Sequence, residues 1–225
     1  MSFNLQRYLT RTSFYLRDTS QKFFGQPQLT DCVNQARTDV CYDTGCSRCY
    51  ATFNAVPSQE KYDFATYVLP NVLNQGYKAD SIAYATSVSA ELNPTLRYKL
   101  NYMVFSSFDA YYRTLPYGFL PGIWTAFDDF SFYLAPIPNA AYVLHIDVVY
   151  LPIYMAQGTD LETVLPSFLA DLVAIKAAQW AKYYERNWPE VDNFTKLYTF
   201  ELNKRFGLRP SSRVPSYYDE NPVNP

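Results

Sequence analysis

The chain is poor in the residues from which most enzyme active sites are built. Its 225 residues include one histidine, His145, and 7 glycines. Because His145 is the one histidine, it alone could act as the base of a Ser-His-Asp or Cys-His site, and most such arrangements are ruled out. The sequence also contains no G-x-S-x-G, no G-x-G-x-x-G and no P-loop motif. These absences argue against catalysis and favour a structural protein that works through its surfaces.

Charge is also scarce, at 18% of residues with a net charge of -2. Proteins that bind DNA tightly through its phosphates usually present a basic face. Because this chain has no excess of basic residues, its composition gives no sign of tight nucleic-acid binding. Arg7, Arg11 and Arg17 could form a small basic cluster near the N-terminus. The favoured interpretation is a solvated helix face.

No stretch approaches the roughly 20 apolar residues that a membrane-spanning helix needs. The first residues, Met1 to Asn4, lack the basic-then-apolar order of a signal peptide. We therefore expect no membrane partner and a protein made and kept in a reducing, cytosol-like compartment.

Aromatic residues, by contrast, are abundant: 22 Tyr, 16 Phe and 3 Trp. A single chain of this length cannot bury that many rings completely. Tyrosine tolerates both apolar and wet surroundings and is enriched at interfaces, so we expect some rings at surfaces that partners cover. The alternative is a tyrosine-rich β protein that is simply well packed.

Four cysteines, Cys32, Cys41, Cys46 and Cys49, lie close together in the sequence. Cys32 and Cys41 would be separated by about 13 Å of helix, too far to share one metal ion. Cys41, Cys46 and Cys49 could form a three-thiolate zinc site, and a disulfide is also open. The favoured interpretation is buried free thiols and no cofactor.

Apolar residues recur at helical spacing near both ends of the chain and once in the middle. The pattern predicts five helices, over residues 4–18, from Leu29 to a stop at Gly45, from Asn93-Pro94 to 115, over 165–184, and from 194 to a stop at Gly207.

Alternating segments predict strands between these helices. A hairpin is expected from residues 50–56 and 61–66, a third strand over 82–88, and a second hairpin from 130–135 and 141–151. The expected fold is α+β, a helical bundle with an inserted antiparallel β region. It forms one domain over residues 1–206, with β-rich regions near 50–90 and 123–155.

Carboxylates are the remaining candidates for catalysis. His145 shares a strand face with Asp147, an arrangement that can do acid–base work but is commonly a plain polar pair. Asp128 and Asp129 are adjacent and so fit a turn between Phe127 and Phe130 better than a catalytic pair. Together with Asp109 they define the alternative of a carboxylate-based hydrolase, with sugar binding as a variant.

The last segment, residues 207–225, is a proline-rich tail that lacks the apolar residues of a core. Proline blocks both helix and central strand, so we expect an extended chain. Its Tyr217-Tyr218 pair suits an arm that docks in a neighbour's groove, while plain disorder is the alternative.

The order of segments resembles the head-to-tail adaptor (head completion or connector) proteins of tailed bacteriophages. The resemblance covers roughly residues 27–206. It is carried by the segments 34–37 with 43–48, 51–53 with 62–64, 132–138 with 141–152, and the two closing helices followed by a loose tail.

That resemblance implies a ring of subunits, typically twelve, beneath the portal in the virion neck. The ring would extend the DNA channel, let DNA pass without sequence-specific contact, serve genome ejection, and present a platform to tail or nozzle proteins. The C-terminal arm would dock on the portal through Arg209, Arg213, Tyr217 and Tyr218. Another virion subunit, such as a tail nozzle, stopper or decoration protein, is the alternative.

Overall fold

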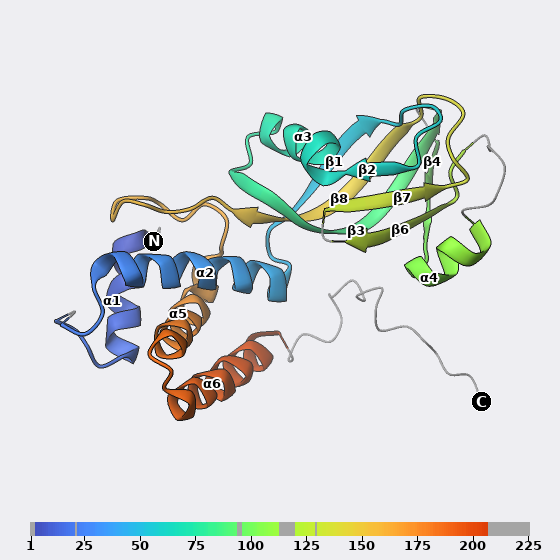
Figure 1. Ribbon diagram of the computed structural model, residues 1–225. Coiled ribbons are helices and arrows are strands. Elements are labelled where there is room, and N and C mark those ends of the chain that lie inside the picture. The colour runs from blue at the N-terminus through green and yellow to red at the C-terminus, as the bar shows by residue number, and fades with distance from the viewer. Residues whose placement is uncertain (1–2, 21, 94–95, 113–119, 129, 207–225) are drawn as a thin grey trace. The chain divides into compact units, whose positions relative to one another are not determined.

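The computed structural model describes residues 3–20, 22–93, 96–112, 120–128 and 130–206 (Figure 1). These residues separate into two compact units. The helical unit holds residues 3–47 and 152–206, and the β unit holds residues 48–151. The fold is α+β, as predicted. The single domain expected over residues 1–206 stays a prediction, and each unit is described by itself.

The helical unit contains α1 (Leu5–Tyr15), α2 (Gln26–Thr44), α5 (Ala170–Tyr184) and α6 (Trp188–Phe206), with a short 3-10 turn, η3 (Ser167–Leu169), before α5. The α5 helix packs against the other three, and most of its alanine, leucine and valine side chains are buried. Asn4 caps α1 by accepting the Arg7 backbone N–H at 3.0 Å. The helices predicted at both ends of the chain are therefore confirmed.

The boundaries of α2 and α6 follow from proline and glycine. Pro27 lies in the first turn of α2, where a missing N–H has no cost. Gly45 ends α2 in the left-handed conformation (φ 56°) and donates its N–H to the Cys41 carbonyl, which confirms the predicted stop. The α6 helix begins at Trp188, with Pro189 in its first turn, and so starts earlier than the predicted residue 194.

The β unit holds two four-stranded sheets. The first has the order β1 (Arg48–Asn54), β8 (Val143–Pro152), β3 (Ala79–Asn93), β4 (Leu96–Lys99). The second has the order β2 (Lys61–Asp63), β7 (Ser131–Ala135), β6 (Ile123–Asp128), β5 (Asn101–Tyr102), with β5 and β6 parallel. The short helix α3 (Leu69–Asn74) and the π turn η1 (Phe64–Val68) before it pack on β1 and β3.

Both predicted hairpins are wrong. The strand β1 pairs with β8, whereas β2 pairs with β7, so each turn connects the two sheets instead of two partners in one sheet. The two turns lie against each other, since the Ser58 N–H donates to the Pro138 carbonyl at 2.9 Å. Alternation marks a half-buried strand but does not identify its partner. Consecutive strands do pair antiparallel elsewhere, β3 with β4 and β6 with β7.

The helix predicted from Asn93 is also wrong within the described residues. The β3 strand continues to Asn93, and β4 and β5 follow. Only two short turns, α4 (Phe105–Ser107) and η2 (Phe108–Tyr112), are helical there. Antiparallel pairing of β4 with β3 and burial of Leu100 stabilise this segment as strand, so tertiary pairing overrides the helical spacing of its apolar residues.

Aromatic rings form the core of the β unit. Phe132 stacks on Tyr62 and Phe64, at centroid distances of 5.4 and 5.7 Å, and meets Phe53 from the first sheet at 6.2 Å. The buried Tyr62 hydroxyl accepts the Val56 N–H at 3.1 Å and lies 3.1 Å from the Gln59 carbonyl. This core joins the two sheets and accounts for part of the aromatic content as ordinary packing.

Candidate interaction surfaces

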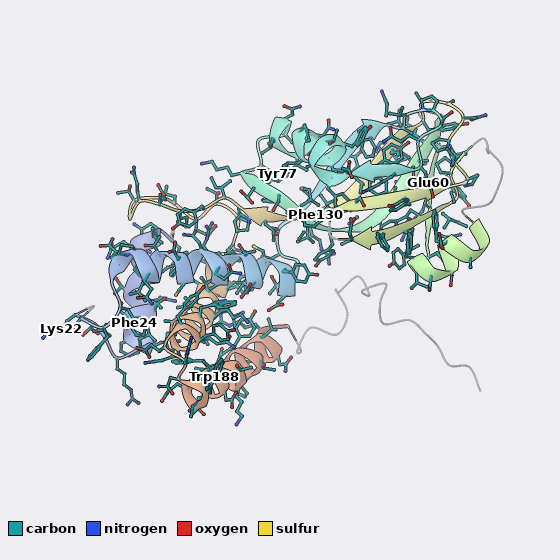
Figure 2. The ribbon with its side chains drawn as sticks, in the orientation of Figure 1. Lys22, Phe24, Glu60, Tyr77, Phe130 and Trp188 are labelled. Atoms are coloured by element: carbon teal, nitrogen blue, oxygen red, sulfur yellow. The ribbon has the colours of Figure 1, made fainter. Side chains whose placement is uncertain are left out.

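A cluster of aromatic side chains lies on the helical unit where α5 ends and α6 begins. This α5–α6 aromatic cluster consists of Trp180, Tyr183, Tyr184 and Trp188, whose neighbouring ring centroids are 5.4–6.1 Å apart. Tyr184 and Trp188 are 56% and 54% exposed, and Figure 2 labels Trp188 at the start of α6. Exposed, mutually packed Trp and Tyr are the side chains that dominate protein interfaces.

Two structural features hold this cluster in place. The Trp180 indole N–H donates to Asp39 on α2 at 2.7 Å. The chain reverses after α5 through Arg186 in the left-handed conformation (φ 59°). There the Arg186 and Asn187 N–H groups donate to the Tyr183 and Lys182 carbonyls. The rings are thus presented by a fixed turn, which reduces the ordering cost of binding.

A second exposed ring on the helical unit is held by Asp18. The buried Asp18 carboxylate accepts the backbone N–H groups of Lys22, Phe23 and Phe24 at 2.9–3.1 Å. Desolvation would raise the pKa of Asp18, but these three donors outweigh it and lower the pKa. Phe24 is buried beneath the Lys182 ammonium, whereas Phe23 is 82% exposed.

The β unit exposes its own rings at the β6–β7 hairpin. This β6–β7 aromatic cluster contains Phe105, Phe127 and Tyr133, whose ring centroids lie 4.2–6.4 Å apart, and Phe130 follows it in the hairpin turn. Phe127 lies 4.2 Å from Phe105 between ring centroids, and Phe130 is 76% exposed. The Asp128 carboxylate fixes the turn by accepting the Phe130 N–H at 3.0 Å and the Ser131 hydroxyl at 2.7 Å. The predicted role of Asp128 in a turn is confirmed, while Asp129 lies outside the described residues.

His145 has a partner other than the one suggested by the sequence. Its Nε2 lies 2.9 Å from Glu91 on β3, and its Nδ1 is hydrogen-bonded to the Tyr50 hydroxyl, whose ring stacks on the imidazole. Asp147 instead accepts the Ser87 hydroxyl. The cluster joins β1, β8 and β3 across one face of the first sheet, which is a structural arrangement of polar side chains.

The segment after β8 is fixed to α2 by a buried polar network. The Arg37 guanidinium pairs with Glu162, with Nε–Oε2 at 2.7 Å and Nη2–Oε1 at 3.1 Å, and donates to the Ile153 carbonyl. Asn34 donates to the Met155 carbonyl and accepts the Met155 N–H. Asn34 and Arg37 belong to the segment 34–37 that contributed to the resemblance, and their role is to hold this connection.

The four cysteines are free thiols. Cys32, Cys41 and Cys49 are buried, and Cys46 is partly exposed. Burial raises the pKa of Cys32 to about 12 and that of Cys49 to about 11. Within the described residues, no group of three or more His, Cys, Asp or Glu side chains is placed to hold a metal ion.

Of the three N-terminal arginines, Arg7 and Arg11 make contacts within the helical unit, and Arg17 lies beyond the end of α1 in the left-handed conformation (φ 56°). Arg11 forms an ion pair with Asp171 on α5, and both Arg7 and Arg11 lie over the Phe3 ring. Because Asp171 offsets the charge of Arg11, these residues fit a solvated helix face better than a basic DNA-binding face.

The docking residues expected in the arm, Arg209, Arg213, Tyr217 and Tyr218, lie outside the described residues, as does the predicted stop at Gly207. No helix in the described ranges is long and apolar enough to cross a membrane. Sequence reasoning anticipated exposed aromatic rings in general. It did not identify these clusters, whose members come together only through the α5–α6 turn and the sheet pairing.

Comparison with known proteins places the chain in a wider context. A family model described as SU10 adaptor protein matches residues 4–219, nearly the whole chain. A search of curated proteins finds no match.

Proposed function

The chain belongs to the SU10 adaptor protein family, and we propose that it is a virion neck protein whose copies form a ring of twelve between portal and tail. The family membership makes it a phage structural adaptor. We propose in addition that the ring contacts the portal and extends the DNA channel, and the family match over residues 4–219 supports this role.

The exposed aromatic clusters support assembly. A subunit in a ring contacts two neighbours through two different surfaces, so it needs more than one interaction surface. The helical unit offers the α5–α6 aromatic cluster and the β unit offers the β6–β7 aromatic cluster. Asp39 anchors Trp180 in the first cluster, and Asp128 fixes the turn beside the second, so both clusters are presented by ordered segments.

The charge balance supports a passive DNA channel. With a net charge of -2, the chain lacks the strong positive field that retains DNA through its phosphates. A channel through which a genome is ejected must let the duplex slide. We propose no catalytic role, because His145, Asp128 and Asp147 all serve local structural contacts.

We further propose that residues 207–225 form the arm that docks on the portal, through Arg209, Arg213, Tyr217 and Tyr218. The support is the family membership and the proline-rich, tyrosine-bearing sequence of this segment. Deletion of residues 208–225 should weaken portal binding and leave the unfolding transition of the remaining chain unchanged. Equal binding by the truncated chain would refute the docking role.

Assembly on a portal tests the function as a whole. The full-length chain is mixed with the portal of the same phage and imaged by electron microscopy. The proposal requires a ring of density beneath the portal that is coaxial with its channel. Absence of this density would remove the adaptor proposal. In whole virions labelled for this chain, a signal at the distal tail or on the capsid surface would instead identify a nozzle, stopper or decoration subunit.

A further inference from the structure

The end of α2 brings two thiols together. Cys41 lies in the last turn of the helix, and Gly45 reverses the chain in the left-handed conformation, with its N–H bonded to the Cys41 carbonyl at 2.9 Å. In such an ending the residue after the glycine folds back over the last helical turn. That residue is Cys46, and its thiol lies close enough to the thiol of Cys41 for the two groups to perturb each other's pKa.

The two sulfurs differ in exposure and in acidity. Cys41 is completely buried, whereas Cys46 is partly exposed. Hydrogen bonding from Cys41 favours the Cys46 thiolate and lowers its pKa, and the same interaction, followed by burial, raises the pKa of Cys41. Cys46 is therefore the nucleophile that a reagent in solution meets, and Cys41 is the adjacent thiol that stays protonated.

We propose that Cys41 and Cys46 form a thiol-oxidation site, which small two-electron oxidants convert to a disulfide across the end of α2. This site belongs to the helical unit and does not depend on the proposed function. It is independent of Cys32, which is buried within α2, and of Cys49, which lies on β1 in the β unit.

The chemistry is complete with an azo oxidant such as diamide. The Cys46 thiolate adds to one nitrogen of the N=N bond, and the other nitrogen takes a proton. The Cys41 sulfur then attacks Cys46 Sγ, the S–N bond breaks, and the leaving nitrogen takes the proton of Cys41. One disulfide forms, two thiols are oxidised by two electrons, and diamide leaves as its hydrazine.

Closing this bond would fix the chain just before it enters the β unit at Arg48. The reduced form holds the same reversal through one backbone hydrogen bond from Gly45. The end of α2 can therefore exist as a dithiol or as a disulfide, and only the disulfide joins Cys41 covalently to Cys46 across the chain reversal.

The chain allows a direct test by peptide mapping. Trypsin cleaves after Arg37 and Arg48, so Cys41 and Cys46 fall together in peptide 38–48, Cys32 in peptide 23–37 and Cys49 in peptide 49–61. The native full-length chain is treated with diamide, acid-quenched, unfolded, alkylated and digested. We expect peptide 38–48 to lose two hydrogens and to carry no alkyl group, while the other two peptides are alkylated.

Three outcomes would overturn the proposal: full alkylation of peptide 38–48, a covalent link between 38–48 and 49–61, or a dimer joined through Cys46. Cys46→Ser should abolish the product and Cys32→Ser, the matched control, should leave it unchanged. With oxidised glutathione as the probe, Cys41→Ser should retain a mixed disulfide on Cys46. Because the mapping of the unaltered chain needs no variant, a folding defect in Cys41→Ser leaves the test decisive.

Discussion

The Arg37 guanidinium and the Glu162 carboxylate form an ion pair that is almost completely buried, with side-chain exposures of 3% and 1%. The pair joins residues 125 positions apart in the sequence. Glu162 also accepts the Val164 and Leu165 N–H groups, so all of its oxygens have partners. Such a pair resists disruption because removing one partner leaves the other charged and buried.

Replacing Arg37 by methionine should therefore lower the free energy of unfolding by about 3–5 kcal/mol. Denaturant unfolding followed by circular dichroism measures the change. The matched control is Arg11→Met, which breaks the exposed pair with Asp171 and should cost less than about 1 kcal/mol. Equal losses in the two variants would contradict the structural role of the buried pair.

The same pair predicts how stability depends on pH. Desolvation alone would raise the pKa of Glu162, but its bonds to Arg37 and to the backbone outweigh desolvation and lower the pKa. A carboxyl whose pKa is lower in the folded state stabilises the fold above its unfolded pKa, about 4.3, and loses that contribution as the pH falls through the folded value.

Unfolding free energies measured in urea from neutral pH downward should thus fall below about pH 4 to 5. Glu162→Gln should be less stable at neutral pH and should show a flatter decline with acid. Some decline will persist in this variant, because the pKa values of Asp18 and Asp128 are also lowered. A variant whose acid profile parallels that of the unaltered chain would argue against this assignment.

The buried Tyr62 hydroxyl gives a prediction for the β unit. Tyr62→Phe keeps the ring that stacks on Phe132 but leaves the Val56 N–H without its acceptor, which should cost about 1 kcal/mol. Phe132→Ala removes the central ring and should cost about 3–5 kcal/mol. Thermal and urea unfolding both measure these losses, and a reversed order would exclude Phe132 from the centre of this core.

The α5–α6 aromatic cluster should matter for assembly more than for folding. Trp188→Ala should change the free energy of unfolding by no more than about 1 kcal/mol, because the ring is largely exposed. If the cluster is an interface, the same change should weaken assembly by about 2 kcal/mol, or roughly 30-fold. Sedimentation with the portal measures the affinity.

Phe200→Ala is the control for that experiment, since Phe200 is also exposed on α6 and lies outside the cluster. A parallel Phe127→Ala substitution examines the β6–β7 aromatic cluster in the same assay. Unchanged assembly in Trp188→Ala would remove the α5–α6 aromatic cluster from the proposed interface.

Helix ends and turns of this fold could be predicted from the sequence, whereas the pairing of its β-strands could not. The stop at Gly45, the helix over residues 4–18 and the turn at Asp128 each depend on a few neighbouring residues. Strand partnership depends on contacts between distant segments, as between Phe53 and Phe132. Two turns that looked like hairpin turns therefore proved to join separate sheets.

The same distinction applies to the candidate sites. Asn34 and Arg37 contributed to the resemblance, but nothing near them indicated Met155 or Glu162 as partners. His145 was expected beside Asp147 because they are near in sequence, whereas Glu91 lies opposite it on another strand. The portal-docking residues of the arm stay predictions.

In the sequence, the β unit is inserted between the two segments of the helical unit, and this order affects how the chain folds during synthesis. The ribosome releases α1 and α2 first, then roughly a hundred residues of the β unit, and only then α5 and Glu162. At typical rates of synthesis, α2 waits on the order of ten seconds for the helix that covers it. During that delay Arg37, Cys32 and Cys41 lack the segments that bury them in the finished fold, so we expect nascent chains to be more prone to aggregation than the stability of the complete chain suggests.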